Sequence, residues 1–180
     1  MGGQRVEGER TLNRAELQEK QTPLKERYKE DPDAALVTLS ARASLGEGIS
    51  CSVETGRAIA EAGLHPATGG DGTQLCSGDM LLEALAACAG VTLRSVATSL
   101  EIPVEGGTVK ADGVLDFRGT LAIDREVAVG FSAISLAFEL DTDADEEQLD
   151  TLIKLTERFC VVLQTLSTSP ELSVTRSRQS

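Results

Sequence analysis

The stretch CSGDMLLEALAACAGVTLRSVATSL, residues 76–100, predicts one long helix and decides the fold. Ser77 is a favourable N-cap, because its hydroxyl can accept a hydrogen bond from the free amides of the first turn. Asp79 then lies in that turn, where the helix dipole favours a negative charge. The apolar residues go round the helix, so we expect burial on most sides. A membrane span is the rival interpretation, but Glu83 and Arg94 interrupt the apolar run below the ~18 residues that a span needs.

Cys88 lies in the middle of this predicted helix, and its neighbours are small: Ala86, Ala87, Ala89 and Gly90. Small neighbours allow another backbone or a substrate to approach the sulfur. A free cysteine is most often a small apolar core residue, so that interpretation competes with a reactive thiol. A thiolate is strongly nucleophilic where its surroundings lower its pKa, whereas a buried thiol without a nearby cation is inert.

Composition places the chain among globular proteins and excludes several functions. The 180 residues fit one domain, with 41% hydrophobic and 26% charged residues. The net charge of -12 argues against a nucleic-acid partner, because phosphate binding needs clustered Lys and Arg. His65 is the only histidine, so a zinc site or a hydrolytic triad would have to be built around it, and neither is expected.

The four cysteines, at 51, 76, 88 and 160, are far apart and form no CxxC pair, which argues against a metal site and a thioredoxin-type motif. The first residues are charged and contain no apolar segment typical of a secretory signal. We therefore expect a reducing cytoplasm, where cysteines stay as thiols unless their chemistry is used.

The sequence predicts a polar N-terminal arm, residues 1–34, and a body, residues 35–180. Within the arm we expect a short helix near residues 23–30 that either docks on the body or forms a solvated arm. Thr22 would cap it, Pro23 suits its first position and Pro32 would end it.

The body begins with three predicted strands, at residues 35–42, 49–54 and 57–62, which form an antiparallel meander. Alternation places Cys51 on the apolar face of the second strand, as a core thiol. The glycine-rich loop at residues 63–78 follows and contains His65. A plain connection is one interpretation of this loop, and the mouth of a site is the other.

Two longer strands are predicted at residues 108–117 and 127–140, with one face exposed to water. Asp143 and Glu146 then have the spacing of a capping box, which starts a second helix. Its apolar stripe has Cys160 one turn beyond its end. A last short strand is predicted around Leu172 and Val174.

The segments SGDMLLEALAACAGVTLR around Cys88 and LTERFCVVLQTL around Cys160 resemble the OsmC/Ohr superfamily of thiol-dependent hydroperoxide reductases, in its OsmC-like branch. The resemblance covers residues 35–175. It implies an α+β fold in which antiparallel sheets wrap around long central Cys-bearing helices. It also implies an intertwined homodimer with its sites at the interface.

The resemblance implies cysteine-based reduction of organic, and more broadly inorganic, hydroperoxides in oxidative-stress defence. Cys88 would be the peroxidatic thiolate, and Cys160 would resolve its sulfenic acid into a disulfide that an external dithiol reduces. It implies no cofactor and no metal, and we expect no membrane or nucleic-acid partner. Two alternatives remain: a non-catalytic dimer that binds a small apolar ligand, and a thiol-based redox sensor.

This sequence departs from the family pattern at several positions. Family members place a Glu before the first cysteine, paired to an Arg that holds the thiolate; here Gly78 matches the Glu, and Asp79 is the nearest carboxylate. Arg57 is our choice for the guanidinium. Val161 replaces the usual Pro after the second cysteine, a change expected to leave that helix unkinked. Cys76, near the helix cap, is an alternative redox partner.

Overall fold

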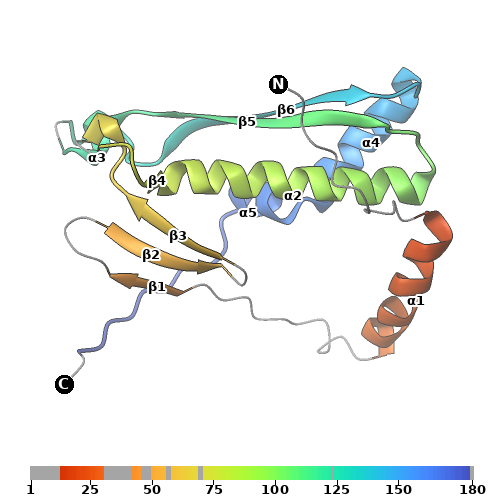
Figure 1. Cartoon of the computed structure of the whole chain (residues 1–180), viewed down its shortest axis with the longest axis horizontal. Coiled ribbons are helices and arrows are strands. Elements are labelled where there is room, and N and C mark those ends of the chain that lie inside the picture. Colours follow the sequence, from red (N-terminus) through yellow and green to blue (C-terminus); the bar gives the residue numbers. More distant parts are fainter. Residues whose placement is uncertain are drawn as a thin grey trace.

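The computed structural model describes residues 13–30, 42–45, 50–55, 58–68, 71–122 and 124–178. Figure 1 shows a long helix, α2, with a two-stranded sheet along one side and two further helices packed against it. In chain order the elements are α1 (Arg14–Glu30), β1 (Arg42–Leu45), β2 (Ser50–Thr55), β3 (Ala58–Gly63), η2 (Pro66–Thr68), β4 (Leu75–Cys76), α2 (Ser77–Leu100), β5 (Gly106–Leu115), α3 (Phe117–Thr120), β6 (Phe131–Asp141), α4 (Glu146–Phe159) and α5 (Val161–Ser167).

Helix α2 spans the residues predicted for it, with one correction at its start. Cys76 is the N-cap and makes no side-chain capping hydrogen bond, so Ser77 is the first helical residue instead of the cap. Cys76 takes this place because it belongs to β4, whose extended backbone leads directly into the helix. Asp79 lies in the first turn, as predicted.

The buried residues of α2 form one stripe in the described chain, so burial on the other sides of the helix stays a prediction that depends on a second chain. The buried residues repeat every fourth position: Leu85, Ala89, Leu93 and Ala97. This stripe faces β5 and α4. Other apolar positions are open, and Val91 is 73% exposed. The elements that the structure describes therefore leave part of the helix surface uncovered.

Two core clusters share this stripe. The first joins Leu93 and Ala97 to Ile102 and to Leu152 of α4, with Phe138 of β6 packed against them. The second joins Leu85 and Ala89 to Cys160. Full burial of a leucine side chain contributes about 1.5–3 kcal/mol, so Leu85 and Leu152, both fully buried, hold α4 and α5 to α2.

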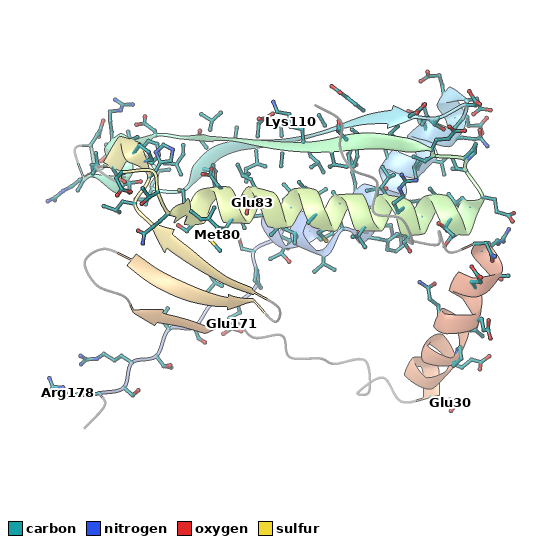
Figure 2. All side chains as sticks on the ribbon, in the orientation of Figure 1. Glu30, Met80, Glu83, Lys110, Glu171 and Arg178 are labelled. Carbon is teal, nitrogen blue, oxygen red and sulfur yellow. The ribbon has the colours of Figure 1, made fainter. Side chains whose placement is uncertain are left out.

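Strands β5 and β6 pair antiparallel from Gly106 with Asp141 to Leu115 with Phe131. The predicted alternation is confirmed: Ile134, Leu136 and Phe138 are partly buried, whereas the residues between them are exposed. Lys110 lies on the outer face of this sheet (Figure 2) and pairs with Asp112 at 2.9 Å. Strand β6 begins at Phe131, because residues 127–130 form bends and irregular backbone instead of the strand predicted there.

The predicted antiparallel meander is confirmed in β1, β2 and β3. Strand β1 covers 42–45 instead of 35–42; residues 35–41 lie outside the described part of the chain. The strand extends to Leu45, which pairs with Cys51. The prediction that Cys51 is a core thiol concerns a side chain outside the described residues. Strand β4 adds a parallel pair, Gly63 with Cys76, that the sequence did not predict.

Helix α1 begins at Arg14, nine residues before the predicted start at Pro23, which lies inside it. The reason is a reciprocal cap. The Asn13 side chain accepts from the Glu16 N–H at 3.0 Å, and the Glu16 carboxylate accepts from the Asn13 N–H at 3.0 Å. Arg14 pairs with Glu101 at 2.6 Å and thereby joins α1 to the end of α2.

Helix α4 starts two residues later than predicted. Its capping box is formed by Asp145 and Gln148 instead of Asp143 and Glu146. Thr142 explains the shift: its hydroxyl donates to the Pro103 carbonyl and accepts from the Ala144 N–H, so the backbone before Asp145 is held outside the helix.

The strand predicted near the C-terminus is wrong. Residues 168–178 form no described strand, and Leu172 and Val174 are 82% and 97% exposed. Their β-forming sequence is not sufficient, because a strand needs a neighbour for its backbone hydrogen bonds and none of the described strands pairs with it.

One helix among the described residues, α2, is long and apolar enough to cross a membrane, with a mean hydropathy of 1.5 over its most apolar segment. Core helices of globular proteins have the same property. The contacts of α2 with β5, α4 and α5 favour a core helix.

Candidate thiol site

Cys88 and Cys160 meet in the second core cluster. Cys88 lies in mid-α2 and is half-buried, whereas Cys160 is completely buried between α4 and α5. Both are free thiols, and the Cys160 thiol hydrogen-bonds with the Cys88 sulfur. The structure thus brings together the two cysteines that the sequence singled out.

The helix is interrupted at Cys160, which corrects the expectation that Val161 leaves it unkinked. Cys160 has an extended backbone, with φ -71° and ψ 106°, and it caps both helices. Its N–H donates to the Thr156 carbonyl at 2.9 Å to end α4, and its carbonyl accepts from the Gln164 N–H at 2.9 Å to begin α5. Cys160 therefore lies at a junction instead of within a helix.

A side chain fixes this junction where the family uses Pro. The last carbonyls of a helix lack partners in their own helix. Here the Gln164 side-chain amide donates to the Glu157 carbonyl at 2.9 Å, across the break. This bond satisfies a carbonyl of the last turn of α4 and fixes α5 relative to it.

The break supplies hydrogen-bond donors for Cys88. The first N–H groups of a new helix lack acceptors in that helix. At the start of α5, the N–H groups of Val162 and Val161 donate to the Cys88 sulfur, and Thr92, one turn further along α2, donates its hydroxyl. The sulfur is thus held by groups from two helices.

The pKa values of the two thiols are shifted in opposite directions. Burial is the largest single influence on Cys88 and opposes its ionisation. The hydrogen bonds from Val162, Cys160, Val161 and Thr92 together outweigh it, so the pKa of Cys88 is lowered. Burial raises the pKa of Cys160, and the adjacent Cys88 sulfur raises it further. Cys88 is therefore the more acidic thiol of the pair, and Cys160 is the less acidic one.

No arginine is among the groups that shift the pKa of Cys88 in the described part of the chain. Arg94, the nearest in sequence, donates to the Val104 and Glu105 carbonyls and so fixes the connection from α2 to β5. Among the described residues, the backbone amides of Val161 and Val162 are groups that favour the Cys88 thiolate. Arg57 lies outside the described residues, so its placement near Cys88 stays a prediction.

His65 and Asp79 lie away from the thiols. The His65 Nδ1 accepts from the Ala67 N–H at 3.0 Å, and its ring stacks on Phe117 at 4.9 Å. His65 therefore stabilises the loop before β4. Asp79 is exposed in the first turn of α2, about 14 Å from Cys88 at 1.5 Å per residue.

Cys76 is not a disulfide partner for Cys88 within one chain. It lies at the N-cap of the helix that carries Cys88, twelve residues earlier, which corresponds to about 18 Å. A disulfide requires Cα atoms roughly 4.4–6.8 Å apart. The alternative pairing suggested by the sequence is therefore wrong for the folded chain.

Thr92 is the functional side chain that sequence reasoning missed. The sequence did contain an indication of this role, because Thr92 is four residues after Cys88, and residues four apart on a helix lie on the same face. The Val161 and Val162 amides had no comparable signal, since their exposure depends on the break at Cys160.

Two grooves lie along α2, and neither is lined by Cys88 or Cys160. One, of about 570 Å³, lies between the second half of α2, α4 and α1, and Thr92 is in its wall. The other, of about 510 Å³, lies between α2, β6 and α5, and Leu85 and Leu163 of the Cys160 cluster line it. Among the residues that the structure describes, no three or more His, Cys, Asp or Glu side chains form a group that could hold a metal ion.

Comparison with known families matches residues 70–175 to the OsmC-like protein family. A search of curated proteins gives no match.

The structure is similar to several solved ones. The OsmC-like protein from Mycoplasma pneumoniae has 18% identity and a TM-score of 0.63, over 74% of this chain and 89% of that one. The organic hydroperoxide resistance protein OsmC from Legionella pneumophila has 19% identity and a TM-score of 0.58, over 73% and 90%. The organic hydroperoxide resistance protein OhrB of Bacillus subtilis has 22% identity and a TM-score of 0.51, over 75% and 94%. These similarities establish the fold.

Thr92→Val is expected to raise the pKa of Cys88, because it removes a donor that favours the thiolate while keeping the shape of the side chain. The thiolate is the nucleophile, so the alkylation rate rises with pH through this pKa. The rate profile of Thr92→Val should move to higher pH, with severalfold slower alkylation at neutral pH. Iodoacetamide labelling of Cys88, followed by peptide mass spectrometry, measures it.

Thr92→Ser is the matched control, because it keeps the hydroxyl, and its profile should follow the parent. A Val profile that overlays the parent, or an equal shift in both variants, would contradict a role for the hydroxyl.

Proposed function

The chain belongs to the OsmC-like protein family, and on that premise we propose that it reduces organic hydroperoxides at Cys88. One observation carries the proposal. A half-buried thiol with a lowered pKa lies in hydrogen-bonding contact with a buried thiol whose pKa is raised. This arrangement pairs a nucleophile with a thiol that stays protonated until it is needed. The proteins named for organic hydroperoxide resistance share the fold and support the substrate class.

In the first step, the Cys88 thiolate attacks the terminal oxygen of the hydroperoxide. The S–O bond forms, the O–O bond breaks, and the alkoxide takes a proton to leave as an alcohol. Cys88 becomes a sulfenic acid, so sulfur is oxidised and the peroxide is reduced. The Val161 and Val162 amides stabilise the thiolate before attack.

In the second step, the Cys160 sulfur attacks the Cys88 sulfenic sulfur. A disulfide forms, the Cys160 proton and the sulfenic hydroxyl leave as water, and the pair has lost two electrons in total. An external dithiol restores both thiols by exchange and becomes a disulfide itself. No metal or cofactor takes part in these steps.

We also propose that two chains form a homodimer through the open face of α2, α4 and α5. Apolar side chains are exposed together there: Val91 is 73%, Phe159 56% and Val161 70% exposed. The meander of β1, β2 and β3 joins the rest of the described chain chiefly through β4. A small sheet of this kind needs a surface to pack against, which a second copy supplies.

Cys88→Ser is expected to abolish hydroperoxide consumption while the fold is retained, because a serine hydroxyl is a far weaker nucleophile at neutral pH. The assay follows loss of cumene hydroperoxide with excess dithiothreitol or dihydrolipoamide. Cys76→Ser is the matched control and should keep parental activity, since Cys76 lies about 18 Å along the helix.

Equal turnover by the parent and Cys88→Ser would exclude the proposed chemistry. Oxidation of Cys88 that no dithiol reverses would favour a redox sensor. A Cys88 that hydroperoxide never oxidises would favour a binding protein.

One equivalent of hydroperoxide is expected to link Cys88 to Cys160 in the reduced protein, because their thiols are already in contact. Non-reducing peptide mass spectrometry should find this linked pair within one chain. In Cys160→Ser, the same treatment should leave Cys88 as sulfenic or sulfinic acid. A Cys76–Cys88 peptide, or sulfinic acid at Cys88 of the parent with Cys160 still a thiol, would contradict the two-cysteine cycle.

Sedimentation at micromolar concentration is expected to give a species of twice the 19.0 kDa chain mass. Val91→Asp should weaken this association, because it would bury a charge in an apolar interface. Val174→Asp is the control, since Val174 is exposed outside that face. A folded 19.0 kDa monomer for the parent would exclude the dimer.

A further inference from the structure

We propose that Gln164 is a positioning residue for the thiol reaction: its side-chain amide occupies the Glu157 carbonyl and so leaves the Val161 N–H free to donate to the Cys88 sulfur. The inference deepens the proposed function, and its consequence for turnover rests on that function. Gln164 is exposed and is not among the groups that hydrogen-bond to either thiol, so it acts through its neighbours.

The hydrogen bonds at the break exchange partners relative to an unbroken helix. In an α-helix each N–H donates to the carbonyl four residues earlier, so the Val161 N–H would donate to the Glu157 carbonyl. Here that carbonyl accepts from the side-chain amide of Gln164 at 2.9 Å. The Val161 N–H donates to Cys88 instead. One helical bond is thus replaced by two others, and neither backbone group loses its partner.

Gln164 is bonded on both sides of Cys160. Its backbone N–H donates to the Cys160 carbonyl at 2.9 Å, in the first turn of α5, while its side chain reaches the last turn of α4. Cys160 lies between these bonds with the extended backbone at which the two helices meet. The one residue therefore holds the first turn of α5 against the end of α4.

This first turn lies beside the reacting sulfur. Helix α5 is in contact with α2 (Figure 1), and Cys88 and Val162 both pack against the buried cluster that contains Cys160. The Val162 N–H donates to Cys88 as well, so two successive amides of α5 contact one sulfur. A change in the placement of this turn would alter both bonds together.

Neutral hydrogen-bond donors control the acidity of Cys88 in the described part of the chain. Cys160 is the one titratable group that contributes to its lowered pKa. The charged side chains of α2, α4, β5 and β6 are all exposed, and α5 has none. Those closest in sequence to the two cysteines are Glu83, Arg94, Glu157 and Arg158. The amides of α5 supply two of the four donors, so their placement has a direct effect on the thiolate.

Loss of the Gln164 amide returns the Glu157 carbonyl to competition for the Val161 N–H. The more this N–H donates to the carbonyl, the less it favours the thiolate, and the pKa of Cys88 rises. A smaller share of Cys88 is then ionised at neutral pH, which slows attack on the O–O bond.

The test replaces Gln164 by Met, which has a similar length and a similar helix propensity but no donor. We expect the pH profile of Cys88 alkylation by iodoacetamide to move to higher pH in Gln164→Met, with severalfold slower labelling at neutral pH. Thr165→Val is the matched control on the same helix. It removes an exposed hydroxyl that donates to the Val161 carbonyl at 2.8 Å, a bond within α5 that does not cross the break. Its profile should follow that of the parent.

A second measurement follows the amide itself. In protein labelled with nitrogen-15 at valine, the Val161 amide proton resonance should shift with pH as Cys88 ionises in the parent. The midpoint of this shift should equal that of the alkylation profile. In Gln164→Met the displacement should be smaller and its midpoint higher, a result that a general loss of stability would not produce. If the added apolar surface of Met promotes association, Gln164→Asn takes its place, because its amide is one methylene too short for the Glu157 carbonyl.

Turnover separates this inference from the proposed function. The kcat/KM of Gln164→Met for cumene hydroperoxide should fall severalfold at neutral pH and approach the parental value at higher pH. If the parent consumes no hydroperoxide but the alkylation profile and the Val161 resonance respond as expected, the proposed function fails and the role of Gln164 stands. An alkylation profile that is unchanged in the folded Gln164 variant, or shifted equally in Thr165→Val, would overturn the inference.

Discussion

The interruption of the backbone hydrogen-bond ladder at Cys160 is the constraint on which the thiol pair depends. A continuous helix would use the amides of Val161 and Val162 internally. The half-buried Cys88 thiol would then have only the Thr92 hydroxyl and the Cys160 thiol as polar neighbours. The break frees these amides and turns them towards the sulfur. A cluster that is otherwise apolar thereby favours a negative charge at one atom.

Helix α2 positions the sulfur that these amides contact. It places Cys88 and Thr92 one turn apart on the same face. The stripe from Leu85 to Ala97 fixes the helix against β5 and α4, and so fixes how far Cys88 is rotated towards α5. Packing thus determines the position of the reactive atom, while the backbone of α5 determines its charge.

Much of this fold was predictable from local patterns. The long helix, the meander and the alternation in β6 follow from periodicity and turn residues. The importance of Cys88 and Cys160 came from the resemblance to a family, and the contact between their thiols agrees with it. Periodicity alone did not distinguish Cys88 from an ordinary core cysteine.

The features that the sequence did not predict depend on contacts between distant segments. Nothing local at Val161 indicates a break, since the bond that fixes it joins Gln164 to a carbonyl of the preceding helix. The later start of α4 depends on Thr142 reaching Pro103. The predicted C-terminal strand was wrong because propensity supplies no pairing partner.

The pairing of β4 with β3 also fixes the start of α2, so that its position does not depend on the length of the loop before β4. The sheet holds Gly63 and Cys76 side by side. The residues between them therefore form a loop whose two ends are fixed by the sheet. The entropy of closing such a loop changes by only about 0.6 kcal/mol for each doubling of its length. This segment can therefore gain or lose residues during evolution without moving the helix that carries Cys88.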